Sequence, residues 1–160
     1  MAFKNNPRIV STSKSVLPEI MDLPEASTQT WYKGELLYLD SGQLKVCATD
    51  ATAIYGIALE DSSGTENTLR QVQPITPDCI VRMRLTQNGT DALTSDSDAD
   101  VGVAFGIYVA SNVHYADLND TTNDAFVYRK AVKDATGGAT YWGDFVIVDS
   151  VCQYHVGTAA

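Results

Sequence analysis

The chain contains few of the residues from which metal sites and disulfide frameworks are built. It has only two histidines, His114 and His155, and neither has a second ligand at a spacing such as H-x-H or H-E-x-x-H. Its three cysteines form no C-x-x-C pair and would leave one thiol unpaired in any disulfide scheme. We therefore expect no metal, no cofactor and no disulfide framework, and a reduced cytosolic environment during synthesis.

Short catalytic motifs are also missing. The sequence has no G-x-S-x-G nucleophile elbow and neither of the common glycine-rich phosphate patterns. No histidine lies near Cys47 along the sequence to activate its thiol. Because an enzyme usually shows at least one convergent set of titratable residues, the sequence predicts a protein that is not an enzyme. Acidic clusters alone keep an enzyme open as a third alternative.

Basic residues are scarce and unevenly placed. Eleven Lys and Arg face 20 Asp and Glu, which gives a net charge of −9 and argues against nucleic acid or an anionic membrane as the main partner. No run approaches the 18 apolar residues of a membrane helix, and the first residues lack the apolar segment of a secretory signal. Residues 1–18 contain three basic residues and no acid, whereas the rest carries 8 basic and 20 acidic residues.

Prolines are few, and three of the five lie within residues 1–30. Together with many Ser, Thr and Asn residues, they disfavour both regular helix and regular sheet. The sequence therefore predicts an extended N-terminal arm over residues 1–30, which could span up to about 100 Å, and a body domain over residues 31–160. An ordinary frayed terminus is the alternative. The candidate residues for contact with a partner are Lys4, Pro7, Arg8 and Lys14.

From Trp31 onward, short apolar runs alternate with turn-forming residues, a pattern typical of an all-β fold. We expect a single β-sandwich or β-barrel-like domain, for which a β-tulip arrangement is one option. "WYKGELLYLDSGQLKVC" predicts a hairpin that turns at Ser41-Gly42. The predicted strands cover residues 35–40, 43–49, 53–60, 69–75, 79–86, 101–110, 125–132 and 143–156.

Two predicted strands, "ELLYL" and "DFVIVD", are apolar on both faces, whereas "CIVRMRL" alternates. A two-sided apolar strand needs cover on both sides, either from a second sheet and a loop or from a neighbouring subunit. We take an adjacent subunit as a plausible source of this cover. The candidate residues for a subunit interface are Trp31, Tyr32, Leu36, Tyr38 and Trp142. Exposed aromatic rings could instead stack on sugars.

The densest acidic segment is "SDSDADVG", where Asp96, Asp98 and Asp100 have the spacing that opens a calcium loop. An EF-hand loop also needs glycine at its sixth position and glutamate at its twelfth. Those positions hold Val101 and Ile107. The three aspartates are therefore only weak metal candidates, and we predict a solvated acidic loop. A second segment, "DLNDTTND", has enough oxygen atoms for a weak cation site.

The segment "YKGELLYLDSGQLKVCATDATAIYGIALED", followed by "VQPITPDCIVRMRLT", resembles the small head-decoration, or cement, proteins of tailed bacteriophages. The shared motifs are Lys33-Gly34-Glu35, Gly42, Ala48, Ile54 to Ala58 and Pro77-Asp78-Cys79-Ile80. They cover roughly residues 31–86, about a third of the chain. The resemblance implies a β-rich oligomer, commonly a trimer, that sits on the outer capsid surface and clamps coat subunits with its N-terminal arm.

The sequence thus predicts a structural virion protein that is made in the host cytoplasm and binds the major capsid protein. It is expected to self-associate as a homotrimer and to stabilise the shell. A tail-tube or fibre-associated subunit is the first alternative. A virion carbohydrate-binding module, which would use Trp31 or Trp142, is the second.

Overall fold

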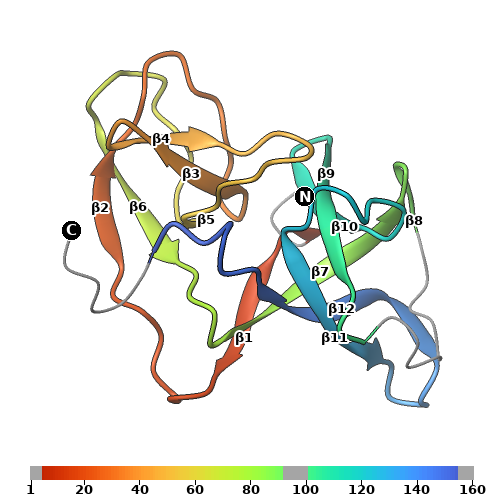
Figure 1. The fold of residues 1–160 in the computed structure, drawn as a ribbon. Helices are drawn as coiled ribbons and strands as arrows, with labels where there is room; N and C mark the ends of the chain where they lie inside the picture. The colour runs from red at the N-terminus through yellow and green to blue at the C-terminus, as the bar shows by residue number, and fades with distance from the viewer. Residues whose placement is uncertain (1–4, 92–100, 155–160) are drawn as a thin grey trace.

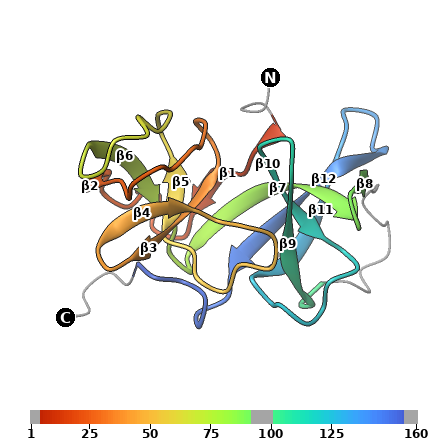
Figure 2. The ribbon, with the colours of Figure 1, turned by 90° about the horizontal axis from the view of Figure 1, so that it is seen from above.

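The computed structural model describes residues 5–91 and 101–154, and these residues form an all-β fold (Figure 1), as predicted. The strands form two sheets, which lie side by side (Figure 2). Sheet A contains β1 (Arg8–Thr12), β7 (Cys79–Gln87), β8 (Thr90–Asp91), β9 (Ala104–Ala110), β10 (Val113–Asp117), β11 (Phe126–Lys133) and β12 (Ala139–Ile147). Sheet B contains β2 (Met21–Pro24), β3 (Leu36–Asp40), β4 (Gln43–Val46), β5 (Gly56–Ala58) and β6 (Leu69–Pro74).

Sheet A closes on itself around β7. This strand pairs with β10 in parallel and with β12 in antiparallel fashion, and the pairs β10–β9, β9–β11 and β11–β12 complete the ring. Alternation along β7 explains its place, because Cys79, Val81, Met83 and Leu85 are fully buried while Arg82 and Arg84 lie on the outer face. The prediction of one wet and one dry face for "CIVRMRL" is therefore confirmed.

Sheet B has the strand order β2-β6-β5-β3-β4. A bridge between Glu25 and Leu44 joins its two ends, and the Ala26 amide donates a hydrogen bond to the Leu44 carbonyl at 3.0 Å. The sheet encloses a set of buried residues, here called the small core: Trp31, Leu37, Leu44, Tyr55, Ala58 and Val72. A larger cluster, the main core, fills sheet A and extends between the two sheets to contact β3 and β5.

The predicted hairpin is present as β3 and β4. Ser41 and Gly42 connect the strands with φ angles of 53° and 82°, the left-handed geometry of a two-residue hairpin turn. Along β3, Leu36 faces the main core and Leu37 the small core. Both apolar faces of "ELLYL" are therefore covered by the chain itself. A neighbouring subunit is not needed to explain the pattern.

The segment predicted as an arm is built into both sheets. β1 pairs with β7, and β2 pairs with β6. Ile9 packs against the main core, while Met21 and Leu23 pack against the small core. These contacts favour a position within the sheets over a free arm. The predicted boundary after residue 30, between an arm and a body domain, is therefore wrong for residues 5–30. The connection between β1 and β2, residues 13–20, belongs to neither sheet.

Candidate functional site

The connection from β1 to β2, residues 13–20, carries several exposed apolar side chains and is here called the apolar loop. Val16, Leu17 and Ile20 are 70%, 52% and 50% exposed. Val10, in the preceding strand, is also exposed. Together they make up half of the eight exposed large hydrophobic residues in the described part of the chain. Apolar side chains that gather in this way typically mark a contact surface.

The apolar loop is held at both ends by hydrogen bonds. The Ser13 amide donates to the Asp78 carbonyl at 3.2 Å, and the Thr12 hydroxyl donates to the Val16 carbonyl at 3.1 Å. Near its far end, the side-chain amide of the buried Gln73 donates to the Pro18 carbonyl at 2.8 Å. The loop is thus fixed against both sheets while its apolar side chains face outward. A loop ordered in advance has less conformational entropy to lose when it binds a partner.

The predicted contact residues have different surroundings. Lys4 lies outside the described residues, and Pro7 is buried. Arg8 is exposed at the start of β1, with its guanidinium carbon 4.9 Å from the centre of the Trp142 ring. Lys14 is exposed within the apolar loop. The structure therefore brings Arg8 together with Trp142 and places Lys14 beside Val16, and it corrects the prediction for Pro7.

The five interface candidates do not form one surface. Trp31 and Leu36 are buried in the small core and the main core respectively, so they are not available to a partner. Tyr38 is half-buried and lines a cavity of about 270 Å³. Tyr32 is exposed, and Trp142 is half-buried next to Arg8. A sugar could not stack on Trp31, which removes that residue from the carbohydrate-binding alternative.

The two acidic segments differ in how much of them the structure describes. Asp96, Asp98 and Asp100 lie outside the described residues, within which no group of three or more His, Cys, Asp or Glu residues is arranged to hold a metal ion. In the second segment, the Asp117 carboxylate accepts hydrogen bonds from the backbone amides of Asn88 and Asn119. The Asp120 carboxylate accepts hydrogen bonds from the backbone amides of Thr122 and Asn123. These carboxylates shape their loops.

A buried polar pair, His114 and Glu35, lies where the two sheets meet. The His114 Nε2 lies 2.9 Å from the Cys47 carbonyl oxygen and donates a hydrogen bond to it. The Nδ1 of the same ring is buried and has no hydrogen-bond partner among the described residues, and it lies 3.8 Å from a Glu35 carboxylate oxygen. Asn6 accepts the His114 amide at 2.8 Å. Burial lowers the pKa of His114 to about 4 and raises the pKa of Glu35. Burial also raises the pKa of the Cys47 thiol, which opposes a nucleophilic role.

His114 predicts a loss of stability in acid. Its folded-state pKa of about 4 lies below the ordinary histidine value of 6.5, so the unfolded chain binds the proton more readily between these values. Its contribution to the free energy of unfolding is complete above pH 6.5 and falls by up to about 3 kcal/mol as the pH drops to 4. Urea unfolding at pH 7, 5.5 and 4 should show this slope in the natural chain and a much smaller one in His114→Gln.

Glu35 provides the control for this titration. Burial raises its pKa, so the folded state binds the proton of Glu35 more tightly than the unfolded chain does. The contribution of Glu35 to the free energy of unfolding therefore grows as the pH falls from the folded-state pKa toward 4.5. Replacing it with glutamine removes this opposing effect, and Glu35→Gln should lose stability in acid more steeply than the natural chain. Equal slopes in the natural chain and His114→Gln would contradict this account of the buried histidine.

Comparison with known proteins adds no relative. No family model matches the chain, and a search of curated proteins finds no match. Within the described ranges, no helix has the length and hydropathy to cross a bilayer. The geometry of the surface is therefore the basis for a functional proposal.

Proposed function

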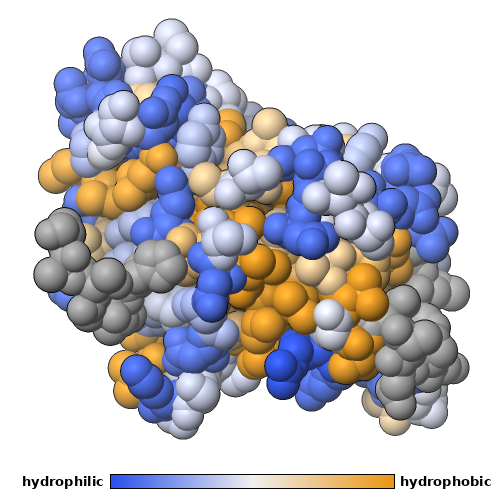
Figure 3. Space-filling model, in the orientation of Figure 1, coloured by the Kyte–Doolittle hydropathy of each residue, from blue (hydrophilic) through white to orange (hydrophobic). Residues whose placement is uncertain are grey.

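We propose that the chain is a structural virion protein that decorates a bacteriophage capsid and stabilises it by binding the major capsid protein on the outer surface. The observation that carries this proposal is the apolar loop. Val16, Leu17 and Ile20 are exposed on a segment that hydrogen bonds fix at both ends. Figure 3 shows further apolar surface over β1 and the adjoining end of β12. The resemblance of residues 31–86 to head-decoration proteins agrees with this role.

The proposed mechanism is preferential binding to the assembled shell. A protein that binds only the assembled state shifts the equilibrium toward it, and stability rises as the sites fill. In this mechanism the apolar loop binds a groove between neighbouring coat subunits, and Lys14 within the loop pairs with an acidic rim of that groove. Association of the protein as a homotrimer would present three apolar loops at once, so that weak single contacts would add up to strong attachment.

A triple substitution of the apolar loop tests this proposal. Val16→Ser, Leu17→Ser and Ile20→Ser together should lower the affinity for assembled coat shells about tenfold or more, because apolar burial drives most such contacts. Their exposure means that the fold should be unaffected. The matched control is Leu69→Ser, which removes an apolar side chain that is 61% exposed on β6. Unchanged binding by the triple variant would contradict the proposal.

If the chain is instead a tail-tube or fibre-associated subunit, the apolar loop attaches it to the tail and not to the shell. Electron microscopy of virions that carry labelled protein separates the two, because label on the shell supports decoration and label confined to the tail supports the alternative.

A further inference from the structure

A second surface feature lies on the outer face of sheet A, where β1, β7, β11 and β12 are neighbours. It is a groove with a volume of about 450 Å³, here called the basic groove. Its lining includes Val10, Ile80, Arg82, Arg129, Lys130 and Asp144. The groove differs from the rest of this acidic chain because three cationic side chains lie in it.

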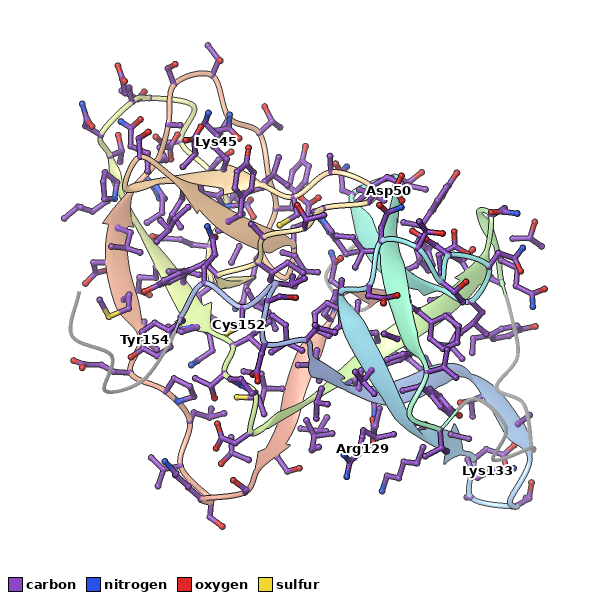
Figure 4. The ribbon with its side chains drawn as sticks, in the orientation of Figure 1. Lys45, Asp50, Arg129, Lys133, Cys152 and Tyr154 are labelled. Carbon is purple, nitrogen blue, oxygen red and sulfur yellow. The ribbon has the colours of Figure 1, made fainter. Side chains whose placement is uncertain are left out.

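The strand register explains why these cations meet. Arg82 points outward from β7, and its cross-strand neighbour on β12 is Asp144. Asp144 in turn lies opposite Lys130 on β11. A bulge in β11 between Tyr128 and Lys130 inserts Arg129 as an extra residue, and bulges commonly redirect side chains in this way. Figure 4 shows Arg129 at the lower side of sheet A.

Among the described lining residues, Asp144 is the one carboxylate that offsets the three cations. Asp144 is buried and forms a two-point ion pair with Arg82, at 2.8 Å and 3.1 Å. The Lys130 ammonium is 4.0 Å from the same carboxylate, and its side chain is 71% exposed. Arg129 is exposed, and no ion pair of it occurs among the described residues. The described lining of the groove therefore has a formal charge of +2, from three cations and one carboxylate, in a chain whose net charge is −9.

We propose that the basic groove binds an acidic segment of another protein. Two carboxylates of that segment pair with Arg129 and Lys130, and an apolar side chain packs against Val10 and Ile80. Arg8 and Trp142, which stack beside the groove, are of the residue types enriched at protein interfaces. Charge complementarity of this kind raises the rate and the specificity of association.

Nucleic acid fits the groove less well than an acidic peptide does. The net charge of −9 repels a long polyanion that extends beyond the groove, whereas a short acidic segment can stay within it. Val10 and Ile80 form an apolar wall of the groove, and a phosphate backbone offers no apolar group to pack against it. An alternating acidic and apolar peptide matches both parts of the lining. This inference concerns the isolated chain and does not depend on the proposed capsid role.

Fluorescence anisotropy with the labelled peptide Gly-Glu-Leu-Glu-Leu-Glu-Gly tests the proposal. Binding should be saturable at low salt and weaken as salt is added. Arg129→Glu with Lys130→Glu should reduce the affinity at least about tenfold, and the milder pair Arg129→Gln with Lys130→Gln should reduce it less. The matched control is Lys33→Glu with Lys45→Glu, which makes the same change in charge at exposed or half-exposed sites that do not line the groove and should bind normally.

Several outcomes would overturn the proposal. Equal binding of a peptide with Gln in place of Glu would show that charge is not recognised, and unchanged affinity in both groove variants would place the binding elsewhere. Tighter binding of a single-stranded oligonucleotide through Arg129 and Lys130 would assign the groove to nucleic acid. Sedimentation that shows self-association lost in the groove variants would assign it to a second copy of the chain. None of these results depends on capsid binding.

Discussion

Replacing Trp31 with alanine is expected to lower the free energy of unfolding by about 4 kcal/mol, because the substitution empties the centre of the small core. The indole is only 1% exposed and packs with the other residues of that core. Its Nε1 donates a hydrogen bond to the Glu60 carbonyl at 3.0 Å, so truncation also leaves a buried acceptor without its partner. Chemical denaturation at neutral pH measures the change.

Tyr32 is the matched control for Trp31. It is the next residue in the chain and is also aromatic, but its side chain is 45% exposed. Tyr32→Ala should change the free energy of unfolding by no more than about 0.5 kcal/mol. If Trp31→Ala were as mild as Tyr32→Ala, Trp31 would be a surface residue and the original prediction of an interface role would regain support.

Replacing Gly56 with alanine should be comparably damaging, at about 4 kcal/mol. Gly56 lies in β5 opposite Pro74 of β6. A Cβ atom at this position would lie 2.8 Å from the Gln73 carbonyl carbon and 2.9 Å from the Pro74 Cα, and closer still to the Gln73 carbonyl oxygen. These are backbone atoms, so relief of the clash requires β5 and β6 to separate.

Gly137 separates this clash from the general cost of replacing a glycine. It lies in the turn between β11 and β12 with a φ of 82°, and an added Cβ would meet no atom within 4 Å. Gly137→Ala should therefore cost only about 1 kcal/mol, which reflects the left-handed backbone alone. Thermal or urea unfolding of both variants gives the comparison. Similar losses in the two would contradict the close approach of β5 and β6.

The parts of the fold that the sequence predicted are those with strong local signals. The β3–β4 hairpin has a turn whose second residue is Gly42, and glycine adopts the left-handed geometry without strain. β7 alternates from Cys79 to Leu85. "ELLYL" also predicted cover on two sides, but its source could not be read locally. That cover comes from residues far away in sequence, such as Val72 in the small core and Phe105 in the main core.

The strands that the sequence did not predict depend on tertiary contacts. β1 and β2 are short, lie near prolines and end their sheets. Their pairing with β7 and β6 across more than 40 residues decides their structure, and local propensity is a weak guide in such cases. β10 is five residues long and contains His114, whose burial relies on Asn6 and Cys47 from distant segments.

The candidate surface could be predicted only in part. Of the four residues predicted to contact a partner, Lys14 is exposed in the apolar loop and Arg8 is exposed and stacks on Trp142, and their contact with a partner stays a prediction. The exposure of Val16, Leu17 and Ile20 could not be predicted, because apolar residues are normally expected inside. The basic groove was missed because its cations come from strands that are distant in sequence and meet only through the register of sheet A.

Co-sedimentation with coat protein tests the proposed function most directly. The protein should be retained in a saturable manner by assembled shells but not by free coat subunits, since only the shell presents the junction between neighbouring subunits. The variant with serine at positions 16, 17 and 20 should lose this retention, whereas Leu69→Ser should keep it. Equal binding to free subunits and shells, or full retention of the triple variant, would contradict the proposal that the apolar loop attaches this protein to an assembled capsid.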